Sequence, residues 1–325
     1  MIGCVFFSFL ASPAFARSST ARHAAAHKGE VRAVKKIEKI VLLTRGRHNP
    51  RTLILRPRGR LRVEPLSFAR LQGLRGVTDS LALASSSVLV LDEANSNVLF
   101  SKHPDVALPI ASITKLMTSL VVLEGNQPLN EPIEVTEDDL DTEKRTRSRL
   151  SPGTVLTRGD LLHLALMSSE NRAAHTLGRN YPGGLQVFVR AMNTKARLLG
   201  MTSAHFVDPT GLSSLNVASA EDLSKLVIAA SQNPTIRMYS TSNGYAVPVG
   251  NRLVAYRNTN ALVSSPTWDI IVQKTGYIAE AGKCLVMKAI IEGRTVVIVL
   301  LDSVGKYTRL ADANRIKKWM ETRAG

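Results

Sequence analysis

Three short motifs, which occur in a fixed order along this chain of 325 residues, restrict its fold more than any other feature. They are Ser112-x-x-Lys115, Ser169-x-Asn171 and Lys274-Thr275-Gly276. A serine beside an amine, a second serine with an amide, and a strand that carries a cation are the groups needed to attack a carbonyl and to hold a neighbouring anion. We therefore expect a fold that brings three distant segments together at one cleft.

The sequence context separates the first motif from a chance match. Ser303-x-x-Lys306 has the same spacing, but it follows an apolar strand-like run and includes a glycine turn, so no helix would hold its lysine. Ser112 instead opens a predicted helix whose apolar residues recur at i, i+3, i+4, i+7 and i+8 from Ile113. Residues three apart on a helix have Cβ atoms about 5–6 Å apart. We therefore expect Ser112 and Lys115 to share one face of this helix.

Lys115 is the candidate base that would activate the Ser112 hydroxyl. A serine hydroxyl is a weak nucleophile without such a base. A lysine accepts a proton only while its amine is uncharged, which requires burial or a neighbouring cation to lower its pKa. Lys274 is the candidate cation. In the alternative interpretation Ser112 only caps the helix and Lys115 is solvated, but the other two motifs argue against it.

The second motif lies where one predicted helix gives way to another. A dense apolar run after Asp160, which we expect to cap the first helix, ends at Met167, and a second apolar pattern begins after Asn171. Ser169 and Asn171 would then lie on the connection and point into a cleft. Ser169 could relay a proton to a leaving amine, and the Asn171 amide could hold a substrate carbonyl. The alternative is simple capping between helices, and two further Ser-x-Asn matches occur, at Ser214-x-Asn216 and Ser231-x-Asn233.

The third motif follows the strand-like residues 270–272 and precedes two further predicted strands, 284–291 and 295–301, joined by a Glu-Gly turn. This pattern predicts an antiparallel sheet that begins with the motif strand. Lys274 suits a substrate carboxylate or the lowering of the Lys115 pKa, and Thr275 suits a hydrogen bond to that carboxylate. Gly276 lets another backbone approach closely. The N–H of Tyr277, together with that of Ser112, is the candidate oxyanion hole.

With these residues in view, the chain resembles the D-alanyl-D-alanine peptidases, which are low-molecular-mass penicillin-binding proteins, and most of all their D-alanyl-D-alanine endopeptidase branch. The resemblance runs from about Asp79 to Glu321. It is carried by four stretches: PIASITKLM (109–117), LALMSSENRAA (164–174), FVDPTGL (206–212) and KTGYIAEAGKCL (274–285).

The resemblance implies an α/β (α+β) fold of the β-lactamase/DD-peptidase type. Such a fold has a five-stranded antiparallel sheet flanked by terminal helices, with an all-helical subdomain inserted at about 125–235. It also implies an acyl-enzyme on Ser112, peptidoglycan stem peptides as substrates, β-lactams as covalent inhibitors, and no cofactor. The chain ends at Gly325, directly after the last predicted helix. Carboxypeptidase relatives usually carry a second β domain and a membrane anchor there, so we expect an endopeptidase.

Three other functions remain open from the sequence. A D,D-carboxypeptidase would use the same chemistry with terminal D-Ala as the leaving group. A β-lactamase would need a loop glutamate placed to activate a deacylating water, and none is evident. An inactive wall-binding protein could keep the same fold, although the intact motifs argue against it.

The beginning of the chain predicts export. Residues 1–16 are apolar and end in Ala-Phe-Ala, which is typical of a signal peptide, so we expect a periplasmic protein. Residues 17–78 form a predicted basic, mostly disordered arm. Sixteen Lys and Arg against three Asp and Glu in residues 17–76 account for +13 of the net charge of +16. This charge predicts either a plain linker or attraction to an anionic envelope surface, whereas nucleic acid does not suit an exported chain.

We expect no metal site. His23 and His27 have helical ligand spacing, but they lie in the arm and no third ligand is evident. His163 and His175 are expected to be packed helix residues. Removal of the signal peptide would leave Cys284 as the one cysteine, and we expect it to pack in a strand.

Overall fold

The structure is a computed structural model that describes residues 40–42, 53–55 and 66–324. The chain divides into two compact units, residues 1–63 and 64–325. In the first unit β1 (Ile40–Leu42) pairs antiparallel with β2 (Leu53–Leu55). The predicted signal peptide and most of the predicted arm lie outside the described residues. Within the described part of the chain, no helix has the length and apolar character needed to cross a bilayer.

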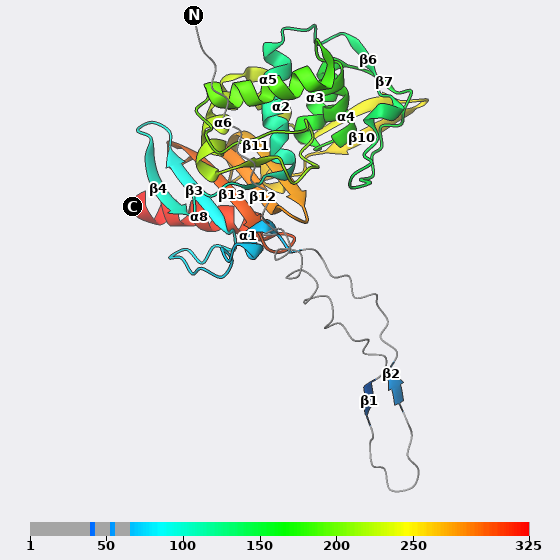
Figure 1. Cartoon of the computed structure of the whole chain (residues 1–325). Helices are drawn as coiled ribbons and strands as arrows, with labels where there is room; N and C mark the ends of the chain where they lie inside the picture. Colours follow the sequence, from blue (N-terminus) through cyan, green and yellow to red (C-terminus); the bar gives the residue numbers. More distant parts are fainter. Residues whose placement is uncertain (1–39, 43–52, 56–65, 325) are drawn as a thin grey trace, which may run out of the picture. The chain divides into compact units, whose positions relative to one another are not determined.

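A five-stranded antiparallel sheet forms the centre of the second unit, as the resemblance implied (Figure 1). Its strand order is β11-β12-β13-β3-β4, so the strand that carries Lys274-Thr275-Gly276 lies at an edge. Strands β12 and β13 are joined at the predicted Glu292-Gly293 turn. The strand bounds are β3 (Ser87–Asp92), β4 (Asn97–Lys102), β11 (Asp269–Ile278), β12 (Gly282–Ile291) and β13 (Arg294–Ser303).

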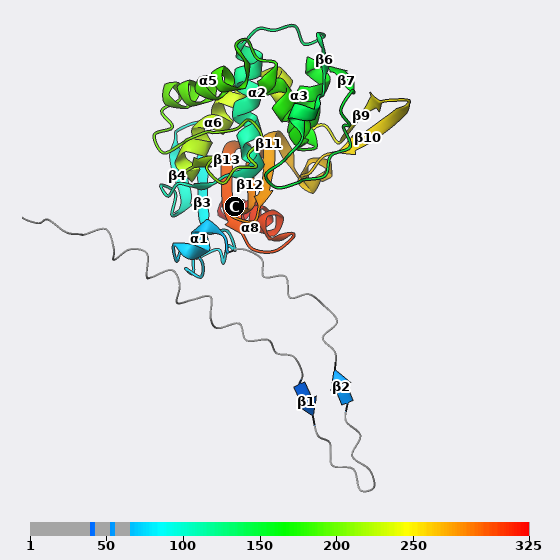
Figure 2. The ribbon, with the colours of Figure 1, turned by 45° about the vertical axis from the view of Figure 1, so that its right-hand side comes forward.

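Helices cover both faces of this sheet because successive strand residues point to opposite faces and both sets are apolar. Val88 and Val90 of β3 belong to one buried cluster, together with Ile316 of α8 (Thr308–Ala324). Leu89 belongs to a second cluster on the other face, together with Leu226 of α6 (Ala220–Gln232). The sheet therefore separates the C-terminal helix from the rest of the helices (Figures 1 and 2).

Helix α2 (Thr114–Glu124) begins two residues after Ser112, is buried along most of its length and precedes the inserted region. The predicted all-helical character is only approximate, because short two-stranded sheets accompany the helices. The helices are α2 (Thr114–Glu124), α3 (Arg158–Met167), α4 (Asn171–Arg179), α5 (Gly184–Leu198) and α7 (Pro234–Thr241), with the 3-10 turns η1 (Ala111–Ile113), η2 (Glu137–Asp139) and η3 (Ala261–Ser264). The strand pairs are β5–β8 (Leu108–Pro109 and Val217–Ala218), β6–β7 (Pro132–Glu134 and Val155–Thr157) and β9–β10 (Gly244–Val249 and Arg252–Arg257).

The second unit begins before the predicted boundary at Asp79. The short helix α1 (Phe68–Leu71) buries Ala69, and the N–H of Phe68 donates to the carbonyl oxygen of Glu280 at 2.8 Å. The Arg75 guanidinium donates two hydrogen bonds to the buried Asp302 carboxylate, at 2.6 and 2.8 Å. Residues 66–78 therefore belong to the folded unit rather than to the arm. Their basic composition resembles that of the arm, so the sequence alone did not separate the two.

Candidate active site

Ser112 lies in the 3-10 turn η1, which leads into α2 at Thr114. The prediction that Ser112 opens an α-helix is therefore right in place, although the first turn is tighter than expected. Ala111 adopts a left-handed φ of 48°, and the Thr114 hydroxyl donates to its carbonyl oxygen at 2.8 Å. An alanine in this backbone region is strained, and such strain is found where a backbone must present a reactive group.

Lys115 is fully buried one turn after Ser112. Its Nζ lies 2.9 Å from Ser112 Oγ, 2.8 Å from Asn171 Oδ1 and 2.6 Å from the carbonyl oxygen of Thr210. Burial lowers the pKa of Lys115 to about 7, while the negative charges of Asp208 and Glu170 oppose that shift. The lysine can therefore be uncharged near neutral pH, which a general base requires.

Burial, rather than the charge of Lys274, is the main cause of the lowered Lys115 pKa. Burial first, and then the charges of Lys115 and Arg309, hold the pKa of Lys274 itself well below its ordinary value. Lys274 Nζ donates instead to Ser169 Oγ at 2.8 Å and to the carbonyl oxygen of Thr275 at 2.9 Å. The lysine of the third motif thus orients the serine of the second.

Ser169 and Asn171 lie at the junction between α3 and α4. Ser169 has a left-handed φ of 61°, and Glu170 caps α4 by accepting the N–H of Arg172. Asn171 is the first residue of α4, and its Nδ2 donates to Thr146 Oγ1 at 3.1 Å. Because Glu170 provides the cap, the side chains of Ser169 and Asn171 are available for the two lysines.

Gly276 allows β11 to lie directly against the turn that holds Ser112. A Cβ atom at this position would lie 2.8 Å from the carbonyl oxygen of Ile110 and 3.2 Å from the backbone nitrogen of Ser112. No larger residue could fit there without displacing the strand. The close approach that the sequence predicted for Gly276 is therefore present, and its partner is the Ser112 turn.

A cavity of about 550 Å³ lies where the three motifs meet. Ser112, Ser169 and Asn171 line it from the helical side. Thr275, Gly276 and Tyr277 line it from β11. Lys115 and Lys274 are fully buried and reach it through their contacts with Ser112 and Ser169. A wider surface hollow along α5 contains none of the eight candidate residues, so the chemistry identifies the smaller cavity as the site.

Arg309 is the main cavity residue that the sequence reasoning missed. It lies in the first turn of α8 and lines the cavity, and its Nε and Nη1 are buried without a hydrogen-bond partner among the described residues. Burial lowers its pKa. The sequence around Arg309 does not indicate that this residue lines a cavity. The packing of α8 on β12 and β13 brings it to the cleft.

The segment after Phe206 supports the Ser112 turn, and its role was also missed. Thr210 binds Lys115 through its carbonyl oxygen, and Gly211 lies so close to Ala111 that a Cβ atom would be 1.9 Å from the Ala111 carbonyl oxygen. Asn216 is buried, and its Nδ2 donates to Thr114 Oγ1 at 3.1 Å. Asn216 belongs to a Ser-x-Asn match that looked accidental, and it proves to be a positioning residue.

The remaining expectations concern side chains outside the cleft. Ser303 Oγ donates to Thr308 Oγ1 at 2.9 Å, so the second Ser-x-x-Lys match forms no comparable site. His163 stacks between Tyr239 and Tyr245, and burial lowers its pKa to about 4. Cys284 is buried in β12, and burial raises its pKa to about 12. Among the described residues no group of His, Cys, Asp and Glu is arranged to hold a metal ion.

Comparisons with known proteins agree with this arrangement. The family model described as D-alanyl-D-alanine carboxypeptidase matches residues 76–305. The D-alanyl-D-alanine endopeptidases of Pseudomonas aeruginosa and Escherichia coli are 47% and 46% identical over 242 residues, which cover 74% of this chain and 78% of each relative. The crystal structure of the Streptomyces K15 DD-transpeptidase is 28% identical with a TM-score of 0.68, and covers 75% of this chain and 98% of its own. The chain therefore belongs to the D-alanyl-D-alanine carboxypeptidase family of peptidases.

Proposed function

We propose that this protein is a serine D-Ala-D-Ala endopeptidase that hydrolyses peptide cross-links of peptidoglycan through an acyl-enzyme on Ser112. One observation carries the proposal: a buried lysine amine, whose pKa is about 7, lies 2.9 Å from a serine hydroxyl at the edge of a cavity. This pair can remove the hydroxyl proton at neutral pH without a histidine.

The reaction begins when Ser112 Oγ attacks the D-Ala carbonyl carbon and Lys115 Nζ accepts the hydroxyl proton. The N–H groups of Ser112 and Tyr277 stabilise the oxyanion. The proton that Lys115 accepted then passes to the leaving amine by way of the Ser169 hydroxyl, which Lys274 orients, as the peptide bond breaks. Lys115, uncharged again, accepts a proton from the water that attacks the ester and returns it to Ser112 Oγ as the acyl group leaves as a free acid. Asn171 holds a carbonyl of the acyl group.

The carboxylate of the leaving group binds at Thr275 and Arg309. The Arg309 guanidinium has two buried N–H groups without partners in the described structure, and a carboxylate would satisfy them. Thr275 Oγ1 lies 2.6 Å from Thr259 Oγ1, which orients its hydroxyl toward the same cavity. Lys274 is less suited to this task, because its amine already donates to Ser169 and Thr275.

The endopeptidase reaction is favoured over the carboxypeptidase reaction by similarity. The relatives named endopeptidase are 46–47% identical to this chain, whereas the carboxypeptidase of Streptomyces K15 is 28% identical. Digestion of purified cross-linked muropeptide dimers tests this choice. An endopeptidase yields monomers, and a carboxypeptidase yields free D-Ala from uncrosslinked pentapeptides while the dimers persist. Ser112→Ala should abolish either product.

We further propose that residues 1–16 direct export to the periplasm and that the basic arm holds the enzyme near an anionic envelope surface. Residues 17–65, the part of the predicted arm that precedes the folded unit, hold 14 Lys and Arg against three Asp and Glu, and this charge of +11 supports the second step. Sedimentation with vesicles rich in anionic lipid tests it. Binding should decline as salt rises toward 0.5 M, because screening shortens the range of the attraction, and salt-independent or absent binding would contradict this role.

A further inference from the structure

A second cavity opens at the end of the sheet where β11 and β13 end and β12 begins. Tyr277, Lys283 and Ser303 lie side by side there, because Tyr277 pairs with Lys283 and Lys283 pairs with Ser303 across the three strands. Ser67 and Arg70, from the segment around α1, also line this cavity, whose volume is about 510 Å³. It shares part of its wall with the catalytic cavity, but its residues from 66–75 and 303–306 take no part in the proposed reaction.

Large apolar and aromatic side chains are exposed around this second cavity. Those that line it, or that lie close in the chain to residues that line it, are Leu66, Phe68, Leu71, Tyr277, Val304 and Tyr307. Leu71 and Tyr307 each keep 66% of their surface exposed. A gathering of exposed apolar surface marks a contact with another molecule or with a membrane. We call the surface formed by residues 66–71, 277–283 and 303–307 the α1 face.

The α1 face is also positively charged. Arg70, Lys283 and Lys306 line its cavity, and the lining residues that the structure describes include no Asp or Glu. Arg75 lines it too, but the Asp302 carboxylate neutralises its charge. Arg70 and Lys306 have no acidic partner among the described residues. The face therefore offers cations to an anionic ligand.

Two of these lysines lie over exposed tyrosine rings. Lys283 Nζ is 3.5 Å from the centre of the Tyr277 ring, and Lys306 Nζ is 5.1 Å from the centre of the Tyr307 ring. A lysine in this position lays its apolar stem along the surface and keeps its charge in water. A tyrosine likewise has an apolar body and a polar tip, which suits the boundary between water and lipid.

The charge of the α1 face decides which partner fits it. Residues 56–62, which shortly precede the face in the sequence, contain four arginines, so this segment would be repelled by it. A second copy of the chain would bring two positive faces together, which is also unfavourable. An anionic bilayer offers phosphates to the cations and the edge of its acyl layer to the apolar side chains.

We propose that the α1 face docks the folded unit on an anionic lipid surface. The inference goes beyond the peptidase reaction, and it extends to the folded unit the attraction proposed above for the basic arm. Because Tyr277 and Lys283 line both cavities, docking through this face holds the mouth of the catalytic cleft beside the lipid.

Spin labels on the full chain test which face meets the lipid. Cys284 is buried, so Cys4→Ser provides a background in which a new surface cysteine takes the label. Leu71→Cys puts the label on the α1 face, and Leu198→Cys puts it on α5, where Leu198 is 77% exposed. On vesicles of phosphatidylglycerol and phosphatidylcholine in equal parts, the label at position 71 should become at least about threefold less accessible to a water-soluble nickel complex. The label at position 198 should not change.

Charge variants test the electrostatic part of the docking. Arg70→Gln combined with Lys306→Gln should lower the affinity for these vesicles about 25-fold, because each cation at an anionic surface contributes about fivefold. Arg190→Gln combined with Arg197→Gln is the matched control, since it removes the same charge from the hollow along α5. The affinity of the control should stay within about twofold of the wild-type value. Labelling of Ser112 by penicillin should be normal in both pairs, which shows that they fold.

A label at position 71 that stays accessible to the nickel complex on bound protein would overturn the α1 face, because the arm alone would then hold the protein. Equal losses of affinity in the two pairs of variants would do so as well, since only total charge would matter. Equal binding to vesicles of phosphatidylcholine alone would remove the role of the cations and overturn the proposal. No binding to either vesicle would exclude a lipid surface and leave an acidic protein as the occupant.

The spin labels decide the matter even where a charge variant fails to fold. Penicillin separates this inference from the proposed function. A protein whose Ser112 is labelled but whose α1 face stays away from lipid loses the docking face alone. A protein that docks through this face without labelling of Ser112 loses the peptidase function instead.

Discussion

At the scale of single residues, the chemistry of the site depends on the surroundings of Lys115. The described contacts of its amine are a hydroxyl, an amide oxygen and a backbone carbonyl oxygen, none of which carries a charge. The sequence could predict that Ser112 and Lys115 share a helical face. It could not predict what buries the lysine, because the contact with Thr210 spans 95 positions in the chain.

The rate of Ser112 acylation should depend on pH through Lys115. Burial lowers the pKa of Lys115 to about 7, so the amine is protonated and unable to act as a base below that pH. The acylation rate constant with penicillin should fall about tenfold for each pH unit below 7 and reach a plateau above it. Lys115→Arg keeps the positive charge but cannot lose its proton, and should lower the plateau by about 10²- to 10⁴-fold. A profile without an inflection between pH 6 and 8 would contradict this role.

Arg309 should recognise the free carboxylate of the leaving group. Removing a charged hydrogen bond to a carboxylate corresponds to a loss of about 10- to 100-fold in kcat/KM. Arg309→Gln should therefore reduce cleavage of a peptide that ends in a free carboxylate while affecting its C-terminal amide much less. Steady-state kinetics on the matched pair of peptides measure this difference. An equal loss for both peptides would show that Arg309 supports the fold rather than the substrate.

At the scale of elements, the structure confirms the strands and helices whose apolar periodicity was clear. The residues at which individual helices begin were less predictable. Asp160 was expected to cap α3, but Thr157 is the cap and Asp160 completes a capping box three residues later. Both residues have the right chemistry, so the sequence alone could not decide between them. The 3-10 turn at Ser112 could not be predicted from the local sequence, because it depends on the strained Ala111 and on Gly211 from a distant segment.

The contact between β11 and the Ser112 turn should tolerate no side chain at position 276. Gly276→Ala would place a Cβ atom 2.8 Å from the carbonyl oxygen of Ile110 and push the strand away from Ser112. We expect penicillin acylation to slow by at least about tenfold, because a small misplacement of reacting groups is costly.

Gly293→Ala serves as the control for Gly276→Ala. Gly293 lies in the β12–β13 turn at a φ of 71°, with open space where a Cβ atom would be. This variant should lose about 1 kcal/mol of stability, because alanine is strained at that φ, while acylation stays normal. If both variants slowed acylation to the same extent, loss of stability rather than of geometry would explain the result for Gly276→Ala.

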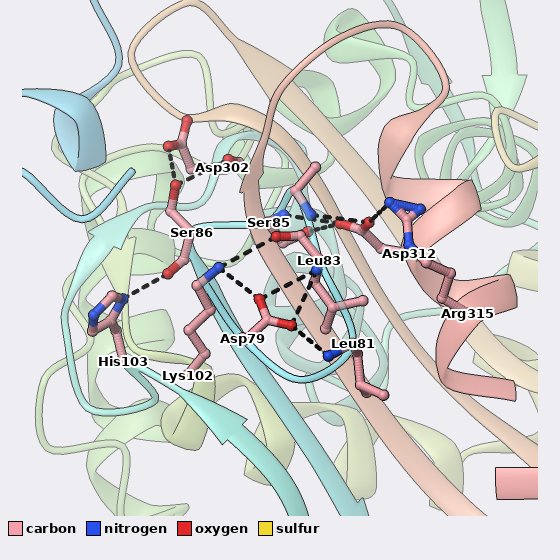
Figure 3. A network of polar contacts seen from close by, with 11 residues as sticks. Asp79, Leu81, Leu83, Ser85, Ser86, Lys102, His103, Asp302, Asp312 and Arg315 are labelled. Atoms are coloured by element: carbon pink, nitrogen blue, oxygen red, sulfur yellow. Dashed lines mark hydrogen bonds and ion pairs between the residues drawn. The ribbon is translucent and has the colours of Figure 1, made fainter. Parts of the chain in front are cut away.

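At the scale of the whole molecule, buried carboxylates join the beginning and the end of the second unit (Figure 3). Asp312 of α8 accepts the N–H and hydroxyl of Ser85 at 2.9 and 2.7 Å. Asp302 accepts the hydroxyl of Ser86 at 2.7 Å in addition to its two bonds from Arg75. The residues in each of these contacts are more than 200 positions apart in the chain, so no local sequence pattern predicts that they meet. The five-stranded antiparallel sheet could be expected from the resemblance, but this network could not.

Loss of the charge at Asp302 should destabilise the whole unit. Asp302→Asn keeps the shape of the side chain and tolerates the left-handed φ of 51°, but it leaves Arg75 without its anion. We expect the free energy of unfolding to fall by about 2–3 kcal/mol. Arg315→Ala, which removes the half-exposed partner of Asp312, should cost less than about 1 kcal/mol. Urea unfolding measures both variants, and equal losses would contradict a special role for Asp302.

The most direct test of the account is to locate the covalent bond that penicillin forms with this protein. Peptide mapping by mass spectrometry after brief treatment should find one adduct, on the peptide that contains Ser112. Ser112→Ala should remove the adduct, and Ser303→Ala, which alters the other Ser-x-x-Lys match, should retain it. A folded protein that carries no adduct on Ser112, or that carries it on another serine, would contradict the central claim.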